Sequence, residues 1–384
     1  MFTRLLKPPK DKSFFLFGPR GTGKTSWVRD KFPQALYLDL LESSTYAELL
    51  ARPERLEELI PLGFDDWIIL DEVQKIPALL NEVHRLIENR KLRFVLTGSS
   101  ARTLRRKGVN LLAGRALTYA MHPLTAVEMG ESFDCLQASK YGLLPAIQTE
   151  PDPKKYLEAY VTTYLREEVL QEGLLRNLGA FTRFLETASF SQGSILTIAD
   201  VARECACGRK TVEGYFNILE DLLLSIRLPV FTKRAKRRMV SHPKFYFFDA
   251  GVYRAIRPRG PLDSEEEIMG AVSETLFYQN LRAINDYLEY EYELYFWRTA
   301  SDLEVDFILY GPRGLLAFEV KSGSTIHPKD LRGLLAFREE YSMVQPFIIY
   351  GGTREMSQQG IPIIPLEQAL HRLPALLNNS AGSK

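Results

Sequence analysis

The chain of 384 residues is long enough to bury more than one hydrophobic core, and its 49 basic and 48 acidic residues leave almost no net charge. This balance excludes a global basic field, so any nucleic-acid contact must come from local patches. Three cysteines are too few for a disulfide framework and fit a reducing, cytoplasmic compartment. We expect neither a membrane span nor a secretory signal, because no apolar run approaches ~18 residues.

The first third of the chain alternates short apolar segments with helix-compatible ones. This pattern is typical of a mainly parallel sheet in an α/β fold. The predicted strands cover residues 14–17, 35–40, 67–70, 93–97 and 116–121.

The remainder of the chain changes character twice. From about residue 124 to 228 the apolar spacing is mostly helical, and a second α/β segment begins near residue 268. Residues 256–263, rich in Pro and Gly, are predicted to be a linker. The sequence therefore predicts three parts, at residues 1–130, 131–255 and 264–377.

A phosphate-binding motif directly follows the first predicted strand. Residues 18–25 match G-x-x-x-x-G-K-[ST] in full and open onto a plausible helical turn. In such a loop the backbone N–H groups surround the phosphates of ATP. Lys24 is expected to reach the β- and γ-phosphates, and the Thr25 hydroxyl to bind Mg²⁺. The predicted nucleotide-binding residues of this segment are Gly18, Pro19, Arg20, Gly21, Thr22, Gly23, Lys24, Thr25 and Ser26.

Two acids end the third predicted strand. Asp71 is placed to complete the Mg²⁺ shell, and Glu72 to act as the general base that polarises the attacking water. Two acids at an exposed strand end are common in isolation, but beside a phosphate-binding loop this simpler interpretation is the weaker one.

Polar residues also follow the fourth predicted strand. Thr97 and Ser99 are candidates to sense the γ-phosphate or hold the water, because ligands bind at this edge of open α/β sheets. Arg115, just before the next strand, is a candidate catalytic residue that stabilises charge on the transferred phosphoryl group. Three further arginines compete for that role: Arg102, Arg105 and Arg106.

Taken together, the segments GPRGTGKT, WIILDEVQ, VLTGSS and LAGRA followed by HPLTAVE closely resemble the AAA-type ATPases of bacteria and archaea. More specifically, they resemble the branch fused to a C-terminal domain of unknown function. The resemblance covers nearly the whole chain. It implies an ATPase core at 1–130, a helical and winged-helix-like middle at 131–255, and a nuclease-like domain at 264–377.

The middle part contains a helix-turn-helix layout. Residues 197–204 and 209–225 are predicted helices around a turn at Cys207 and Gly208, and residues 228–248 are a candidate two-stranded wing. Basic residues near the wing tip would contact DNA phosphates: Lys233, Arg234, Lys236, Arg237 and Arg238. Such units also serve as packing modules, so DNA binding and a purely structural role stay open here.

The C-terminal part contains a hairpin of residues 304–310 and 315–321. A turn centred on Pro312 and Arg313 pairs Gly311 with Gly314, which sets Asp306 opposite Glu319 and Glu304 opposite Lys321 on one face. Facing carboxylates repel each other, so Asp306 and Glu319 are candidate ligands of Mg²⁺ or Mn²⁺. Lys321 would orient water or stabilise charge on the phosphoryl group.

The spacing Asp…Glu-x-Lys resembles the PD-(D/E)xK restriction-endonuclease-like superfamily. The resemblance implies that Asp306 and Glu319 are metal ligands, that Lys321 is catalytic, and that Glu274, on a predicted helix from residue 268 to 285, is a further metal ligand. Val305 stands where the motif has Pro. The alternative is the polar outside of a half-buried hairpin.

The leading hypothesis is an ATPase that acts on nucleic acid, with DNA as partner, and couples ATP turnover to a metal-dependent nuclease domain. The alternative is a nucleotide-switched signalling or scaffold ATPase whose nuclease-like domain only binds a partner or DNA. A third is a DNA-binding regulator. The sequence leaves the oligomeric state open, although ATPases with an arginine acting in trans form rings or dimers.

Overall fold

The structure is a computed structural model that describes residues 2–100, 112–165, 169, 177–235, 237, 239–261 and 263–378. The chain forms two compact units. The first contains Leu6–His122 and Asp221–Leu223; the second contains Met1–Leu5, Pro123–Glu220 and Leu224–Lys384. The second and third parts predicted from the sequence thus fall within one unit. Among the described residues, no helix has the length and apolar character needed to cross a membrane.

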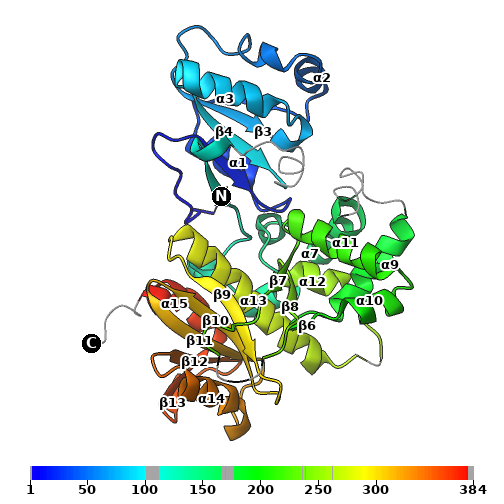
Figure 1. Cartoon of the computed structure of the whole chain (residues 1–384), viewed down its shortest axis with the longest axis vertical. Coiled ribbons are helices and arrows are strands. Elements are labelled where there is room, and N and C mark those ends of the chain that lie inside the picture. The colour runs from blue at the N-terminus through cyan, green and yellow to red at the C-terminus, as the bar shows by residue number, and fades with distance from the viewer. Residues whose placement is uncertain are drawn as a thin grey trace. The chain divides into compact units, whose positions relative to one another are not determined.

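The first unit is built on a parallel sheet of five strands in the order β2-β3-β4-β1-β5 (Figure 1). Its strands are β1 (Phe14–Phe17), β2 (Leu36–Asp39), β3 (Trp67–Asp71), β4 (Arg93–Gly98) and β5 (Leu117–Ala120). Every pairing among them is parallel, which confirms the predicted α/β class.

The helices of this unit cover a sheet that is apolar on both faces. They are α1 (Lys24–Lys31), α2 (Ser43–Ala51) and α3 (Leu79–Arg90), with short 3₁₀ turns at Pro53–Leu56, Val73–Lys75 and Leu112–Gly114. Strands β3 and β4 are buried almost throughout because parallel strands are covered by helices on either side. Leu79, Leu80, Val83 and Leu86 form the buried stripe of α3.

The second unit begins with short helices. They are α5 (Ala126–Met129), α6 (Cys135–Tyr141), α7 (Pro153–Ala159), α9 (Leu178–Ser189), α10 (Ile198–Glu204), α11 (Arg209–Asp221) and α12 (Ala250–Ile256). Short 3₁₀ turns lie at Gly130–Ser132 and Pro145–Gln148, and a π-helical segment spans Tyr160–Leu165. Side chains of Asp134, Asp152 and Asn177 cap α6, α7 and α9 by accepting backbone N–H bonds.

Helices α10 and α11 confirm the predicted helix-turn-helix layout, but the predicted wing is different. Strands β7 (Ser225–Leu228) and β8 (Lys244–Phe247) are joined by a third, β6 (Ser194–Ile195), in the order β6-β8-β7. The segment between β7 and β8 packs on the C-terminal sheet through bridges at Val230–Phe296 and Met239–Thr299. Phe231 is buried there, so this segment is not a free hairpin.

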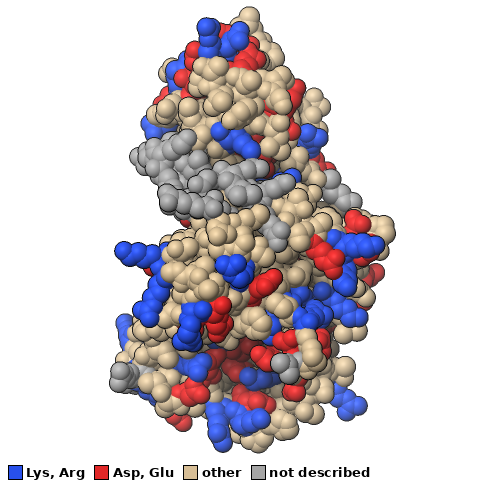
Figure 2. All heavy atoms as spheres, turned by 90° about the vertical axis from the view of Figure 1, so that its right-hand side faces the viewer, with Lys and Arg blue, Asp and Glu red and all other residues tan. Residues whose placement is uncertain are grey.

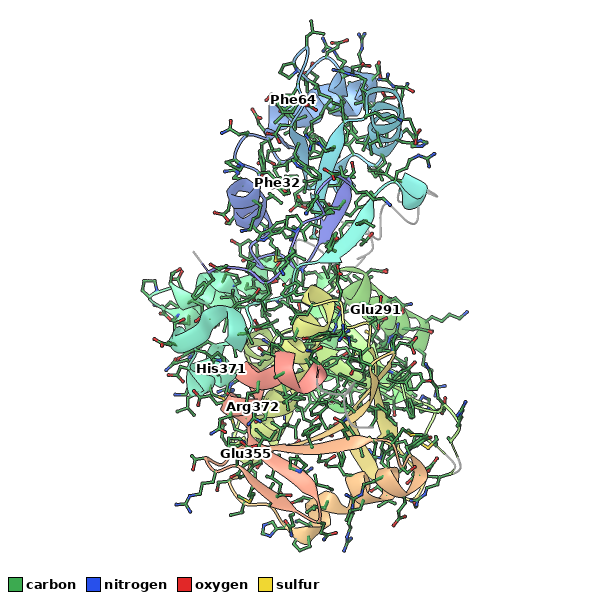
Figure 3. All side chains as sticks on the ribbon, turned by 90° about the vertical axis from the view of Figure 1, so that its left-hand side faces the viewer. Phe32, Phe64, Glu291, Glu355, His371 and Arg372 are labelled. Carbon is green, nitrogen blue, oxygen red and sulfur yellow. The ribbon has the colours of Figure 1, made fainter. Side chains whose placement is uncertain are left out.

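The C-terminal sheet has six strands in the order β13-β14-β12-β11-β10-β9. They are β9 (Glu293–Arg298), β10 (Glu304–Gly311), β11 (Gly314–Lys321), β12 (Gln345–Tyr350), β13 (Met356–Gln358) and β14 (Ile361–Pro365). Its helices are α13 (Glu265–Tyr287), α14 (Arg332–Glu340) and α15 (Leu366–Asn378), with a 3₁₀ turn at Pro328–Leu331. On α15, Arg372 faces Glu355 and pairs with it at 2.7 Å (Figure 3).

The β10–β11 hairpin has the predicted register. Gly311 lies opposite Gly314, and Phe307 opposite Phe318. The paired residues end there, and β10 carries an irregularity against β9 between Val305 and Ile308. The next two positions outward are therefore Asp306 and Glu319, the two acids on which the nuclease hypothesis depends.

Candidate functional site

The loop between β1 and α1 has the backbone that a phosphate-binding loop needs. Gly21 and Gly23 have φ of 85° and 90°, in the region that favours glycine. A Cβ at Gly18 would lie 2.4 Å from the carbonyl oxygen of Met121, so this position also excludes a side chain. Lys24 is 6% exposed, and its Nζ donates to the carbonyl oxygens of Gly18 at 2.7 Å and Pro19 at 3.2 Å. The lysine therefore lies across the loop.

Asp71 is the centre of a hydroxyl cluster at the end of β3. Its Oδ2 accepts from Thr25 Oγ1 at 2.9 Å and from the hydroxyl of Tyr37, while its Oδ1 accepts from Thr97 Oγ1. Burial and the Asp71 carboxylate raise the pKa of Tyr37, so the phenol stays a donor. Thr25, Asp71 and Thr97, predicted separately, are thus brought together. Tyr37 was missed, since a Tyr on a predicted strand carries no signal of its own.

Glu72 and Ser99 are linked by a residue that the sequence analysis passed over. Gln74 Nε2 donates to the Glu72 carboxylate and lies 3.1 Å from Ser99 Oγ. Glu72 has a φ of 61°, unusual for a non-glycine residue, which turns the chain sharply after β3. The signal for Gln74 was its place at the end of the segment WIILDEVQ, two residues after Glu72.

The candidate arginine has a partner away from this cluster. Arg115 Nε donates to the Glu88 carboxylate on α3, and the Arg115 side chain is 37% exposed. Its role in phosphoryl transfer stays a prediction. Arg102, Arg105 and Arg106 lie outside the described residues. In the loop, Arg20 and Ser26 are exposed, whereas Pro19 and Thr22 are buried.

The C-terminal acids surround a buried lysine that was not predicted. The side chain of Lys244, on β8, is 1% exposed. Its Nζ lies 2.9 Å from Asp306 Oδ1 and 3.8 Å from Glu274 Oε2, and it also pairs with Glu304. Lys244 was missed because it belongs to the segment interpreted as a wing, far from the hairpin in sequence.

Glu319 and Lys321 form the second half of the cluster. Lys321 Nζ donates to Glu319 Oε1 at 2.6 Å, and the backbone N–H of Val320 donates to Asp306 Oδ2 at 2.9 Å. Glu304 pairs with Lys244 and Arg298, although the predicted register set it opposite Lys321. The other oxygen of Glu319, Oε2, is buried without a hydrogen-bond partner.

The protonation preferences follow from burial and neighbouring charge. Burial and the Asp306 carboxylate raise the pKa of Glu319 to about 8. The same two causes raise the pKa of Glu274 to about 8. Burial opposes ionisation of Asp306, but the ammonium groups of Lys244 and Lys321 hold its pKa below the usual value. Asp306 is therefore the acid that the cluster keeps charged.

The three predicted carboxylate ligands do not form one metal site. No group of three or more His, Cys, Asp or Glu side chains in the described part of the chain is placed to hold a metal ion. Lys244 lies between Glu274 and Asp306, and the hydroxyl of Tyr246 donates to Glu274 at 2.9 Å. Asp306 and Glu319 remain as a two-carboxylate pair. Mg²⁺ in proteins is often held by one or two carboxylates and waters. Of the oxygens in this pair, Glu319 Oε2 is the one without a hydrogen-bond partner among the described residues, and so the one able to meet such an ion.

Three family models match successive parts of the chain. Residues 10–130 match an AAA domain, residues 136–263 a domain of unknown function (DUF8612), and residues 269–369 a domain of unknown function (DUF4143). The chain therefore carries an AAA-type ATPase domain of the class that binds and hydrolyses ATP, usually with Mg²⁺.

Among individual proteins, uncharacterized proteins of Mycobacterium tuberculosis and Mycobacterium bovis are each 27% identical over 366 residues, covering 92% of this chain and 80% of each relative. The Aeropyrum pernix ORC1 protein, solved in complex with DNA, is 14% identical over 65% of this chain and 87% of its own, with a TM-score of 0.28. A Vibrio cholerae protein, VC1899, is 11% identical over 96% of this chain and 99% of its own, with a TM-score of 0.24. Because the TM-scores of these two structures are so low, their similarity supports no inference about this chain.

Proposed function

We propose that this protein couples ATP hydrolysis in its AAA-type domain to metal-dependent cleavage of nucleic acid by its C-terminal domain. One observation carries the second half of the proposal. A buried carboxylate oxygen, Glu319 Oε2, has no hydrogen-bond partner and belongs to a side chain beside ionised Asp306 and the ammonium of Lys321. An unpaired buried acceptor of this kind is costly unless a cation or donor meets it.

At the ATP site, each residue has a defined task. The loop N–H groups and Lys24 bind the phosphates, and Lys24 must leave the carbonyl oxygens of Gly18 and Pro19 to do so. Thr25 and Asp71 would hold the Mg²⁺, which neutralises charge on the phosphate oxygens when bound. Glu72, held by Gln74, orients the attacking water, and Ser99 shares the same amide.

At the C-terminal site, Asp306 and Glu319 would hold Mg²⁺ or Mn²⁺, which would polarise a phosphodiester and lower the pKa of water. Lys321 lies at the more open side of the cluster, with 34% of its side chain exposed, so it can meet a substrate phosphate. Lys244 is fully buried and positions Asp306 instead. Glu274 accepts a hydrogen bond from the hydroxyl of Tyr246, and burial and the Asp306 carboxylate raise its pKa to about 8.

Any contact with DNA would have to come from local groups of basic side chains. Two of the basic residues predicted at the wing tip pair with acids of the C-terminal part: Lys233 with Glu293, and Arg237 with Glu339 at 3.3 Å. Lys236 and Arg238 lie outside the described residues. Basic and acidic side chains are intermixed over the face in Figure 2. Contacts to nucleic acid would therefore be made by few cations, and binding should weaken only gradually with salt, because the salt dependence scales with the number of phosphates that are neutralised.

The alternative is a nucleotide-switched scaffold whose C-terminal domain binds a partner or DNA without cutting it. The position of Lys244 favours it, because a buried ammonium 2.9 Å from Asp306 already neutralises much of the charge that a metal would meet. In that protein ATP would control assembly, and the cluster would be a structural ion network.

A cleavage assay on the full chain separates the two. Purified protein is incubated with plasmid DNA, single-stranded DNA or RNA and with Mg²⁺ or Mn²⁺, in the presence and absence of ATP. The proposal predicts cleavage that Asp306→Asn and Lys321→Met each reduce by about 100-fold or more. Lys329→Met, which changes an exposed lysine outside the cluster, is the matched control. ATP turnover without cleavage of any substrate would support the scaffold.

A further inference from the structure

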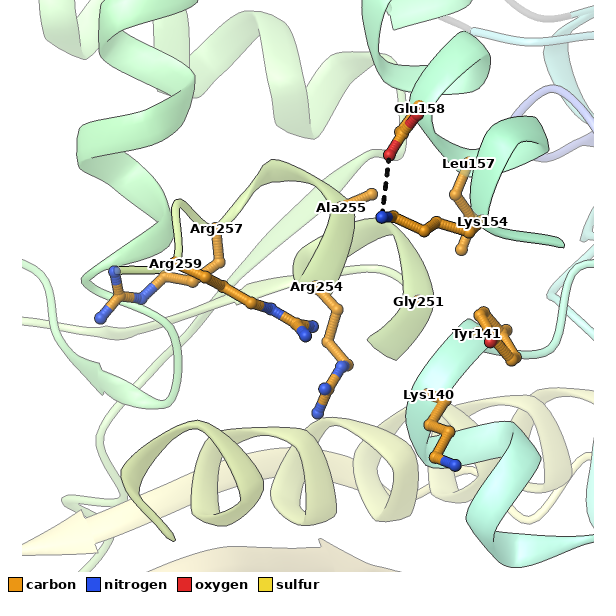
Figure 4. Close-up of a pocket in the computed structure, with 10 residues that line it drawn as sticks. All are labelled: Lys140, Tyr141, Lys154, Leu157, Glu158, Gly251, Arg254, Ala255, Arg257 and Arg259. Atoms are coloured by element: carbon orange, nitrogen blue, oxygen red, sulfur yellow. Dashed lines mark ion pairs between the residues drawn. The ribbon is translucent and has the colours of Figure 1, made fainter. Parts of the chain in front are cut away.

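A pocket lies in the second unit, away from both sites described above. It has a volume of about 530 Å³ and is lined by the end of α6, by α7, by α12 and by the residues that follow α12 (Figure 4). Ligand pockets in proteins range from about 300 to 1,000 Å³, so the space suits one small molecule. Nothing in the ATPase or nuclease proposal uses it.

The walls of this pocket are fixed by close packing. A Cβ at Gly251 would lie 2.0 Å from the carbonyl oxygen of Tyr141, so α6 and α12 meet backbone to backbone. The buried carboxylate of Asp249 caps α12 through Gly251 N at 2.9 Å and also accepts from Leu143 N at 2.8 Å. The two helices are thereby tied together, and the pocket between them is preformed.

The lining is strongly basic. Among the residues that the structure describes, five cationic side chains and one acidic side chain, Glu158, line the pocket. Glu158 lies 3.8 Å from Lys154, and both side chains are more than half exposed, so this pair is weak. Lys140 and Arg259 take part in no ion pair within the part of the chain that the structure describes. Arg257 pairs with Asp263 at 2.9 Å, and Arg254 with Glu265, so the charge available to a ligand comes mainly from Lys140 and Arg259.

Arg254 supplies the buried anchor of the pocket. Its side chain is 8% exposed; Nη2 lies 3.2 Å from Glu265 Oε1, and Nη1 lies 3.3 Å from Met269 Sδ. Its Nε is buried and has no hydrogen-bond partner. An unpaired buried guanidinium N–H is a costly arrangement, so the described residues do not fully satisfy the donors of Arg254.

We propose that this pocket binds a small phosphate-bearing molecule of nucleotide size. Phosphate oxygens match the donors of Arg254, Lys140 and Arg259 in charge and in number. Tyr141, Leu157 and Ala255 add an aromatic and two aliphatic walls, which suit a base or another ring attached to the phosphate. A duplex is disfavoured as the occupant because the Arg254 anchor lies too deep for a phosphate backbone on the surface.

Calorimetric titration of the full chain tests the proposal. The protein carries Lys24→Ala, so that the phosphate-binding loop does not compete, and the probes are inorganic pyrophosphate, AMP and adenosine, each alone. We expect pyrophosphate or AMP to bind with a 1:1 stoichiometry and adenosine to bind at least about tenfold more weakly, because it lacks the charged group. If pyrophosphate binds and AMP does not, the pocket is a site for phosphate groups and not for a nucleotide.

Variants locate the binding. Arg254→Gln should weaken it by about tenfold or more, and the pair Lys140→Gln with Arg259→Gln by roughly threefold to tenfold. Lys155→Gln is the matched control, because Lys155 is on the same helix as Lys154 but does not line the pocket. If Arg254→Gln does not fold, the double variant of the exposed residues Lys140 and Arg259 still tests whether the ligand binds in this pocket.

Three results would overturn the proposal. One is no heat from pyrophosphate or AMP at millimolar concentration. Another is binding that the pocket variants leave unchanged. The third is displacement of the probe by a blunt, unphosphorylated DNA duplex through the same residues, which would make the pocket part of a nucleic-acid surface.

Discussion

Removing the buried ammonium of Lys244 tests whether the C-terminal cluster is held together by charge. In Lys244→Met the side chain keeps a similar length but loses its contacts at 2.9 Å to Asp306 and 3.8 Å to Glu274. Breaking a buried ion pair by deleting one partner costs about 3–5 kcal/mol, since the remaining charge is left unpaired. The side chains of Lys244 and Asp306 are 1% and 6% exposed, so this ion pair is buried and the same cost applies to it.

The effect is measured by urea unfolding. Of the three tryptophans, Trp297 alone lies in the second unit, so a background with Trp27→Phe and Trp67→Phe makes fluorescence report on that unit. We expect Lys244→Met to lower the free energy of unfolding by about 3–5 kcal/mol. Adding Asp306→Asn should restore part of this loss, because it removes the carboxylate that was left unpaired.

The matched control is Lys233→Met, which removes an exposed ion pair with Glu293. Exposed pairs contribute little to stability, so this variant should unfold close to the parent. If Lys244→Met lowers the free energy of unfolding by no more than the control does, the buried ammonium does not hold the cluster together. Equal losses in the single variant and in the double variant with Asp306→Asn would show that the two residues do not act as a pair.

Three further predictions follow from the structure. Lys24→Ala and Asp71→Asn should each reduce ATP turnover by about 100-fold or more, measured as phosphate release, and near-normal turnover in either would exclude this ATP site. Asp249→Ala should lower the free energy of unfolding by about 2–4 kcal/mol in the same urea assay, because it removes the cap of α12 and leaves the buried Leu143 N–H unpaired. Burial raises the pKa of Cys135 to about 11, so iodoacetamide should label it slowly at pH 8 and faster with each pH unit up to that value; labelling at pH 8 as fast as a free thiol would contradict this.

The sequence predicted the first unit well because its strands are continuous apolar runs. All five strands of that sheet lie within two residues of their predicted bounds. The β10–β11 register was predictable for a different reason: the turn at Pro312 and Arg313 sets the pairing of Gly311 with Gly314, and the pairs out to Phe307 and Phe318 follow from it. In both cases local chemistry and the global fold agree. The predicted pairing of Glu304 with Lys321 does not form, and Glu304 lies opposite Arg298 of β9.

Predictions failed where tertiary packing overrode a local pattern. The run of leucines after Asp221 was predicted to continue α11, but the helix ends there and Leu223 has a φ of 60°, a conformation that stops a helix. Burial of Leu222 and Leu224 on either side fits this bend. Likewise, the basic segment after β7 was predicted as a free wing, whereas buried Phe231 and its neighbours attach it to the C-terminal sheet.

The two sites stabilise a buried carboxylate in different ways, and the difference affects what each can bind. Asp71 is held by the hydroxyls of Thr25, Tyr37 and Thr97, which donate hydrogen bonds but leave its negative charge in place for a cation.

At the C-terminal site, the ammonium groups of Lys244 and Lys321 are shared by four acids: Glu274, Glu304, Asp306 and Glu319. Glu304 also pairs with Arg298. Asp306 is the acid that stays charged, whereas Glu319, whose pKa is raised to about 8, would lose its proton when a metal meets Oε2, the oxygen without a hydrogen-bond partner among the described residues. A divalent ion would therefore meet a full charge at Asp71 but a largely neutralised cluster at Asp306. We expect metal binding at the C-terminal site to be the weaker of the two, and to depend on Glu319 more than on Glu274.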